Sequence, residues 1–124
     1  MNNSGTRSGG TTSPITSHIL DMRLGRPAAG VAVTLERRGA DESWQFLGRD
    51  ATNSDGRASG LFLEGELAPG RYRLTFDTGS YFAEQQVDHF YPLVTIEFQV
   101  ARADQHYHVP LLLSPFGYST YRGS

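Results

Sequence analysis

The chain has 124 residues, which is enough for one domain that buries a core without disulfides or a structural metal. All 11 of its basic residues are arginine, it contains no cysteine, and its formal net charge is −2. The absence of lysine and cysteine excludes Schiff-base, P-loop, thiol and disulfide chemistry. The net negative charge argues against a nucleic-acid partner.

The start of the chain differs in composition from the rest. Residues 1–12 are polar and rich in glycine and serine, without the apolar segment of a secretory signal. We therefore interpret residues 1–13 as a disordered arm, residues 14–124 as one domain, and the cytoplasm as the location. No part of the sequence approaches the ~18 consecutive apolar residues of a membrane-spanning helix, so no membrane partner is expected.

Beyond the arm, apolar residues mostly recur at every second position, which predicts β-strands. In chain order, strands are expected at residues 15–21, 31–36, 44–46, 72–76, 95–100 and 106–114. Residues 53–56 form a turn cluster in which Gly56 can take a positive φ. Residues 78–86 break the alternation and predict a short helix, with Ser80 as its N-cap and Tyr81 and Phe82 facing the core. Short strands with frequent turns indicate an antiparallel β-sandwich.

Two histidines in the last predicted strand are the first candidates for chemistry. His106 and His108 are two positions apart, so they project from the same face, about 6.6 Å apart along the strand. The opposite face is continuously apolar or aromatic and is the predicted core side, so the pair faces solvent, another subunit or a ligand. The spacing alone leaves three interpretations open: solvated side chains, half of a metal site completed by His18, and a pair of catalytic imidazoles.

Two further segments carry polar groups that a site could use. Arg57 follows an Asp-Gly turn, where an arginine is usually an exposed charge. The chain terminus, residues 118–124, would usually fray. It is, however, rich in aromatic and hydrogen-bonding side chains, which favours docking against the domain.

Taken together, four segments resemble 5-hydroxyisourate hydrolases, the enzyme branch of the transthyretin-like family. They are residues 17–21 (SHILD) with 25–35, residues 52–57 (TNSDGR), residues 106–114 (HYHVPLLLS) and residues 118–124 (YSTYRGS). The resemblance extends over residues 14–124, and the terminal Tyr-Arg-Gly-Ser placed after His-x-His is its most specific part.

The resemblance implies an all-β, transthyretin-like (prealbumin) antiparallel sandwich of two four-stranded sheets with one short helix. It also implies a homotetramer built as a dimer of dimers, with active sites in a channel between subunits. The outward face of the histidine strand would then become the wall of a cleft.

The activity implied by the family is the hydrolytic opening of 5-hydroxyisourate in urate breakdown, a part of purine catabolism. His18 and His108 would activate water and move protons. Arg57 would hold the ring and stabilise the developing oxyanion. Ser124 would orient the water or a histidine through its carboxylate. The substrate-binding set would be His18, Arg57, His106, Tyr121, Arg122 and Gly123.

Other functions are compatible with the same pattern. We expect no cofactor, and the rival mechanism uses a metal held by the histidines. The alternative function is a non-catalytic carrier that binds a small ligand in the channel between subunits, because one fold can host both activities. A module for protein contacts is a third reading, but it leaves the polar residues without a purpose.

Overall fold

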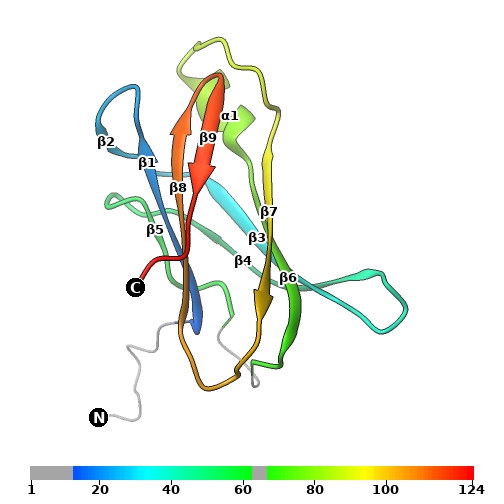
Figure 1. Cartoon of the computed structure of the whole chain (residues 1–124). Coiled ribbons are helices and arrows are strands. Elements are labelled where there is room, and N and C mark those ends of the chain that lie inside the picture. The colour runs from blue at the N-terminus through cyan, green and yellow to red at the C-terminus, as the bar shows by residue number, and fades with distance from the viewer. Residues whose placement is uncertain (1–12, 63–66) are drawn as a thin grey trace.

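The computed structural model describes residues 13–62 and 67–124 of the chain, and Figure 1 shows their arrangement. The strands are β1 (Ile15–Asp21), β2 (Arg26–Pro27), β3 (Ala32–Arg38), β4 (Trp44–Ala51), β5 (Arg57–Ala58), β6 (Gly70–Phe76), β7 (Val94–Val100), β8 (Tyr107–Ser114) and β9 (Gly117–Thr120), and the helix is α1 (Thr78–Glu84). All six predicted strands are present, and several are longer than predicted.

The strands form two sheets that face each other, as the alternating pattern predicts. One sheet has the order β2-β1-β8-β9, with β5 also paired to β1, and the other has the order β4-β3-β6-β7. Among the described residues, the first sheet therefore has five strands where four were expected. The additional strand, β2, forms because Gly25, at a φ of 70°, reverses the chain and pairs Arg26 with Asp21.

The pair β1–β8 departs from the predicted antiparallel arrangement. These two strands run parallel, with Thr16 opposite His108 and His18 opposite Pro110, whereas the other strand pairs are antiparallel. Between β1 and β8 the chain adds the short strands β2 and β5 to this sheet, builds the second sheet and α1, and then returns in β8 in the same direction as β1. A parallel pair needs such a long crossover, which turn signals alone do not reveal.

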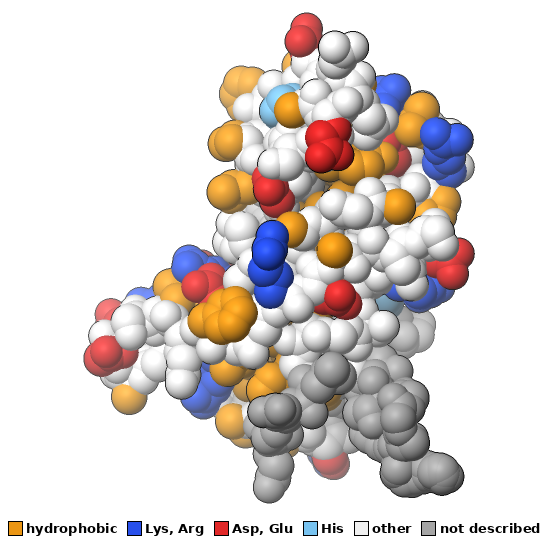
Figure 2. Space-filling view, turned by 180° about the vertical axis from the view of Figure 1, so that it is seen from behind, with side chains coloured by type: hydrophobic (Ala, Val, Ile, Leu, Met, Phe, Trp, Pro, Cys, Tyr) orange, Lys and Arg blue, Asp and Glu red, His pale blue; other side chains and the backbone are white. Residues whose placement is uncertain are grey.

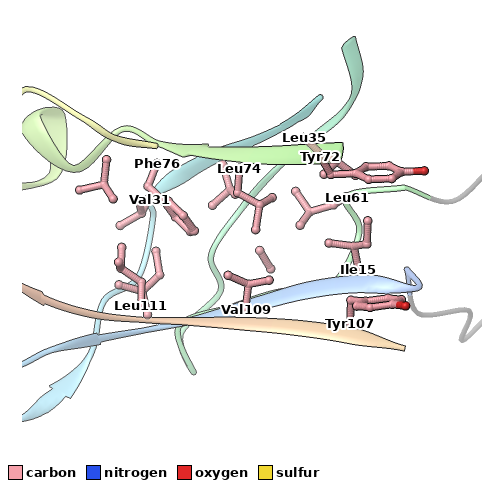
Figure 3. Close-up of a cluster of buried hydrophobic side chains, with 14 of the residues drawn as sticks. Ile15, Val31, Leu35, Leu61, Tyr72, Leu74, Phe76, Tyr107, Val109 and Leu111 are labelled. Carbon is pink, nitrogen blue, oxygen red and sulfur yellow. The ribbon is translucent and has the colours of Figure 1, made fainter. Parts of the chain in front are cut away.

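The core lies between the sheets, and its strand residues come mainly from the inward faces of β1, β3, β6 and β8. Tyr107, Val109, Leu111 and Leu113 of β8 are buried, as their alternation predicts. Figure 3 shows the two layers of side chains meeting, with Tyr72 and Tyr107 closing one end of the cluster. Their hydroxyls point to that end, where each bonds to a nearby backbone carbonyl, at Ala68 and Arg102. Each buried strand residue thus leaves its neighbours on the outer face.

The short helix is present, but its N-cap is not Ser80. Asp77 caps it, since its carboxylate accepts the backbone N–H of Ser80 at 3.3 Å and the Ser80 hydroxyl at 2.8 Å. A cap accepts from the residue three positions later, which makes Asp77 the cap and Ser80 a residue of the first turn. Phe82 is buried, and Tyr81 packs at the edge of the core.

Two predictions concern the termini and the membrane. Ser13, the last residue of the predicted arm, is buried and its Oγ accepts the backbone N–H groups of Ile15 and Phe62. The rest of that arm, residues 1–12, lies outside the described residues. Within residues 13–62 and 67–124, no helix has the length and apolar character needed to cross a bilayer. The cytoplasmic location stays a prediction.

Candidate active site

Three strands of the first sheet bring the predicted site residues to its outer face. The sequence Asn53 to Gly56 forms the predicted turn: Asn53 Oδ1 accepts the N–H groups of Asp55 and Arg57, and Gly56 has a φ of 75°. The turn delivers Arg57 into β5, where it pairs with His18 of β1. A side chain at Gly56 would meet the Ile19 carbonyl oxygen at 2.6 Å, so the turn needs glycine for space as well as for φ.

The two histidines of the His-x-His pair meet a hydroxyl that sequence reasoning did not single out. The Oγ1 of Thr16 lies 2.9 Å from His106 Nε2 and 2.8 Å from His108 Nδ1. The imidazole rings are nearly parallel, at 23°, with centroids 6.5 Å apart. A signal for Thr16 existed, because it shares the outward face of β1 with His18; only the register with β8 connects it to His108.

The C-terminal tail docks against β8, as its composition favours. Figure 1 shows it leaving β9 and crossing β8 toward β1. Gly123 donates its N–H to the His108 carbonyl at 2.8 Å. A Cβ at Gly123 would lie 2.6 Å from His108 Cδ2, so glycine allows the backbone to cross directly over the imidazole. The tail therefore forms one wall beside His108.

These elements enclose a cavity of about 390 Å³ on the outer face of the sheet. The residues that line it are all polar or charged: Thr16, Ser17, Arg57, Ser59, His106, His108 and Ser124. Four of the eight predicted site residues are therefore together in this cavity, namely Arg57, His106, His108 and Ser124. Ser17 and Ser59 are lining residues that the sequence did not indicate. The volume is within the range of small-molecule sites.

The other predicted residues lie beside the cavity or away from it. Gly123 packs on the His108 ring, and His18 stands next to Arg57 on the same face. Tyr121 and Arg122 border a second hollow, of about 300 Å³, between β7 and the tail. Arg122 donates to Gln105 Oε1 at 3.1 Å, and its guanidinium stacks on the Tyr107 ring at 4.6 Å. These contacts anchor the tail to the domain.

The environment of His108 favours its neutral form. Burial of the ring lowers the pKa of His108 below the ordinary 6.5, and the neighbouring basic groups His106, Arg57 and His18 lower it further. A neutral imidazole at physiological pH can accept a proton from water. Burial, together with the neighbouring basic groups, thus favours a His108 that can act as a base.

The metal-assisted mechanism requires several side chains close enough together to coordinate one metal ion. In the part of the chain that the structure describes, no three histidine, aspartate or glutamate side chains are grouped closely enough to hold one metal ion. His106 and His108 instead share the Thr16 hydroxyl.

The fold and this site define a transthyretin-like sandwich with a polar, histidine-bearing cavity. Residues 15–123 match the HIUase/Transthyretin family, and the chain belongs to this family. It is 50% identical over 107 residues to a 5-hydroxyisourate hydrolase of Salmonella dublin, which covers 86% of this chain and 78% of the relative. The corresponding mouse (Mus musculus) enzyme is 45% identical over 114 residues, covering 91% of this chain and 97% of the relative.

Solved structures resemble both branches of the family. The 5-hydroxyisourate hydrolase of Klebsiella pneumoniae superimposes with a TM-score of 0.76 at 38% identity, covering 92% of this chain and 100% of that one. Transthyretin from Sparus aurata gives a TM-score of 0.84 at 32% identity, covering 89% of this chain and 96% of that one. The predicted fold class is thereby confirmed.

Proposed function

We propose that this protein hydrolyses 5-hydroxyisourate to 2-oxo-4-hydroxy-4-carboxy-5-ureidoimidazoline in urate breakdown. The observation that carries the proposal is the cavity of about 390 Å³ whose lining residues are all polar or charged. Such a lining suits a flat heterocycle with many carbonyl and N–H groups. Family membership and relatives named 5-hydroxyisourate hydrolase at up to 50% identity support it.

The site must assist three steps of the reaction. Water must lose a proton as its oxygen bonds to a ring carbonyl carbon; the oxyanion that forms must be stabilised; and the adjacent C–N bond must break with a proton passing to the nitrogen. His108, held neutral, is suited to take the proton from water and return it to the leaving nitrogen. No cofactor enters this scheme.

Arg57 is assigned the binding of the ring and the stabilisation of the oxyanion. Its guanidinium is permanently charged and presents its donors in a fixed plane. Within residues 13–62 and 67–124 it forms no ion pair, so its charge remains available to a ligand. We assign to His18 the transfer of protons together with His108. We assign to the Ser124 carboxylate the orientation of the water. His106 and Gly123 complete the wall at the cavity, and Tyr121 and Arg122 hold the tail that supplies it.

The carrier alternative draws on the same fold. The structural similarity to Sparus aurata transthyretin, with a TM-score of 0.84, favours it as the second candidate. A carrier of apolar aromatic ligands would need an apolar lining, whereas this cavity is lined by arginine, histidine and hydroxyl groups. The hydrolase proposal therefore accounts for more of the residues present.

The deciding experiment generates 5-hydroxyisourate freshly from urate and follows its ultraviolet decay. We expect the protein to accelerate the decay in proportion to its concentration, also after exhaustive treatment with chelator. Decay at the spontaneous rate would overturn the hydrolase proposal and leave the carrier. Activity lost with chelator and restored by zinc would replace the cofactor-free scheme with a metal-assisted one.

We further propose that the protein is a homotetramer, a dimer of dimers. β7 and β9 end the two sheets, and each leaves an edge without a pairing strand in the described chain. An aromatic cluster of Phe90, Tyr91 and Tyr118 lies exposed near them. Exposed edges with apolar side chains favour association of subunits. Light scattering coupled to size exclusion should give four times the 13.7 kDa chain mass, and a monomer would contradict the proposal.

A further inference from the structure

The Thr16 hydroxyl lies between the two imidazoles of the cavity, which raises the question of how its hydrogen bonds are directed. Its Oγ1 is 2.9 Å from His106 Nε2 and 2.8 Å from His108 Nδ1, and the residue is only 6% exposed. A hydroxyl has one proton to donate and two lone pairs that accept. At most one of the two ring nitrogens can therefore receive the Thr16 proton, and the other must donate its own N–H.

The direction of these bonds decides whether Nε2 of His108 carries a proton or a lone pair. If Thr16 donated to Nδ1 of His108, the neutral ring would carry its proton on Nε2, and that nitrogen could not accept a proton from water. If His108 donates from Nδ1 to Oγ1, the lone pair of Nε2 is free. In a neutral histidine the partner of one nitrogen selects the tautomer in this way.

We propose that Thr16 is a positioning residue that accepts the Nδ1–H of His108 and donates its own proton to Nε2 of His106, so that His108 presents a basic Nε2 to the cavity. The inference rests on the proposed hydrolysis, for which His108 must accept a proton. Thr16 acts in it only through the histidines, as the group that orients the base.

The local fold makes Thr16 suitable for this task. Its β-branched side chain has few rotamers, and β1 places it directly opposite His108 in the parallel register. Because the hydroxyl is buried, water competes poorly for the two hydrogen bonds. A hydroxyl also carries no charge, so it fixes the tautomer of His108 without stabilising the imidazolium as a carboxylate would.

The test compares Thr16→Val, which keeps the shape and removes the hydroxyl, with Thr16→Ser, which keeps the hydroxyl. We expect the valine variant to lose about 10- to 100-fold in kcat with KM changed by less than about threefold. The serine variant should keep kcat within about threefold of the wild type. A valine variant with unchanged kcat would overturn the proposal.

Nitrogen-15 NMR of the histidine rings measures the tautomer directly and does not depend on turnover. In the wild type, His108 should carry its proton on Nδ1, and in Thr16→Val its two nitrogens should approach the averaged shifts of a free neutral imidazole. A wild-type His108 protonated on Nε2 contradicts the assignment even if the valine variant fails to fold. Absence of hydrolysis by the wild type would instead defeat the proposed function, while the NMR result still tests the hydrogen-bond assignment.

Thr52→Val is the matched control for loss of a buried threonine hydroxyl. The Thr52 hydroxyl donates to the Ala28 carbonyl at 2.7 Å and accepts the Val31 N–H at 2.9 Å, outside the cavity. It should lower the thermal unfolding temperature and leave kcat and the His108 tautomer unchanged. If this control lost kcat as Thr16→Val does, the effect would be one of stability, and the positioning role would fall.

Discussion

Arginine side chains lie on the outer faces of both sheets, but their surroundings differ. On the sheet β4-β3-β6-β7, Arg73 forms an ion pair with Glu36 at 2.6 Å and stacks on the Trp44 ring at 4.3 Å. Arg38 stacks on the same ring at 5.4 Å. Figure 2 shows basic and acidic side chains interspersed on the face seen from behind, from which the β3–β4 hairpin projects. Arg38 also forms an ion pair with Glu42 at 3.4 Å, so Arg73 and Arg38 both have acidic partners within the chain.

On the other sheet, Arg57 borders a cavity whose described lining residues include no side-chain carboxylate. Its neighbours there are histidines and hydroxyl groups, and the pKa of His108 is lowered by burial and then by these basic neighbours. A cluster of unpaired basic groups is unfavourable for folding and is typical of a site that binds an electron-rich ligand. Arg73 and Arg38 thus support the fold, whereas Arg57 is the arginine to which we assign a role in the proposed hydrolysis.

Replacing Arg57 tests this difference between the two sheets most directly and should have the largest effect. Arg57→Gln should lower kcat/KM by about 100- to 1,000-fold, since a positioned donor to an oxyanion is lost. The free energy of unfolding should change by less than about 0.5 kcal/mol, because the side chain is exposed and unpaired within the described chain. Steady-state kinetics and urea unfolding measure the two quantities.

Arg73→Gln is the matched control on the opposite sheet. It should leave kcat/KM unchanged and lower the free energy of unfolding by up to about 1 kcal/mol, as expected for a partly exposed ion pair. If Arg73→Gln impaired turnover as strongly as Arg57→Gln, the proposed division between the two faces would be wrong.

The next effect in size concerns the tail over His108. Gly123→Ala places a Cβ 2.6 Å from His108 Cδ2, so either the ring or the tail must shift. A displacement near 1 Å in a catalytic geometry can cost about 100-fold, and we expect a loss of kcat of about 10- to 100-fold. Gly117→Ala is the control, because its Cβ would meet only Ser114 Oγ at 3.7 Å, an ordinary contact. Equal activity of Gly123→Ala and the wild type would remove the tail from the site.

The smallest effect is a shift in the pH profile. Burial and neighbouring basic groups lower the pKa of His108 below 6.5, so its neutral form persists to lower pH. We therefore expect kcat/KM to fall only when the pH drops below the lowered pKa of His108. His106→Asn removes one of the neighbouring basic groups that lower the pKa of His108, so this pKa rises and the acid limb moves to higher pH. A limb that stays in place, or moves to lower pH, would exclude His108 as the group that titrates.

Several features of the site could be predicted from the sequence because they are local. The alternation in residues 106–114 correctly assigned one face to the core and the histidines to the other. The Asn-Ser-Asp-Gly turn predicted the positive φ of Gly56, which is 75°. The helix was also predicted, although its cap was misassigned by three residues, from Asp77 to Ser80.

Local alternation was enough to identify the buried face of β8, and short motifs were enough to identify the family that the chain resembles. Which outward residues meet depends instead on how distant strands pair. Thr16 and His108 are 92 positions apart, and the parallel register of β1 and β8 brings them together. The path of the tail over His108 likewise depends on the backbone hydrogen bond between Gly123 and His108. Strand periodicity reports on burial along one segment, whereas the pairing of distant segments is set by the packing of the whole sandwich.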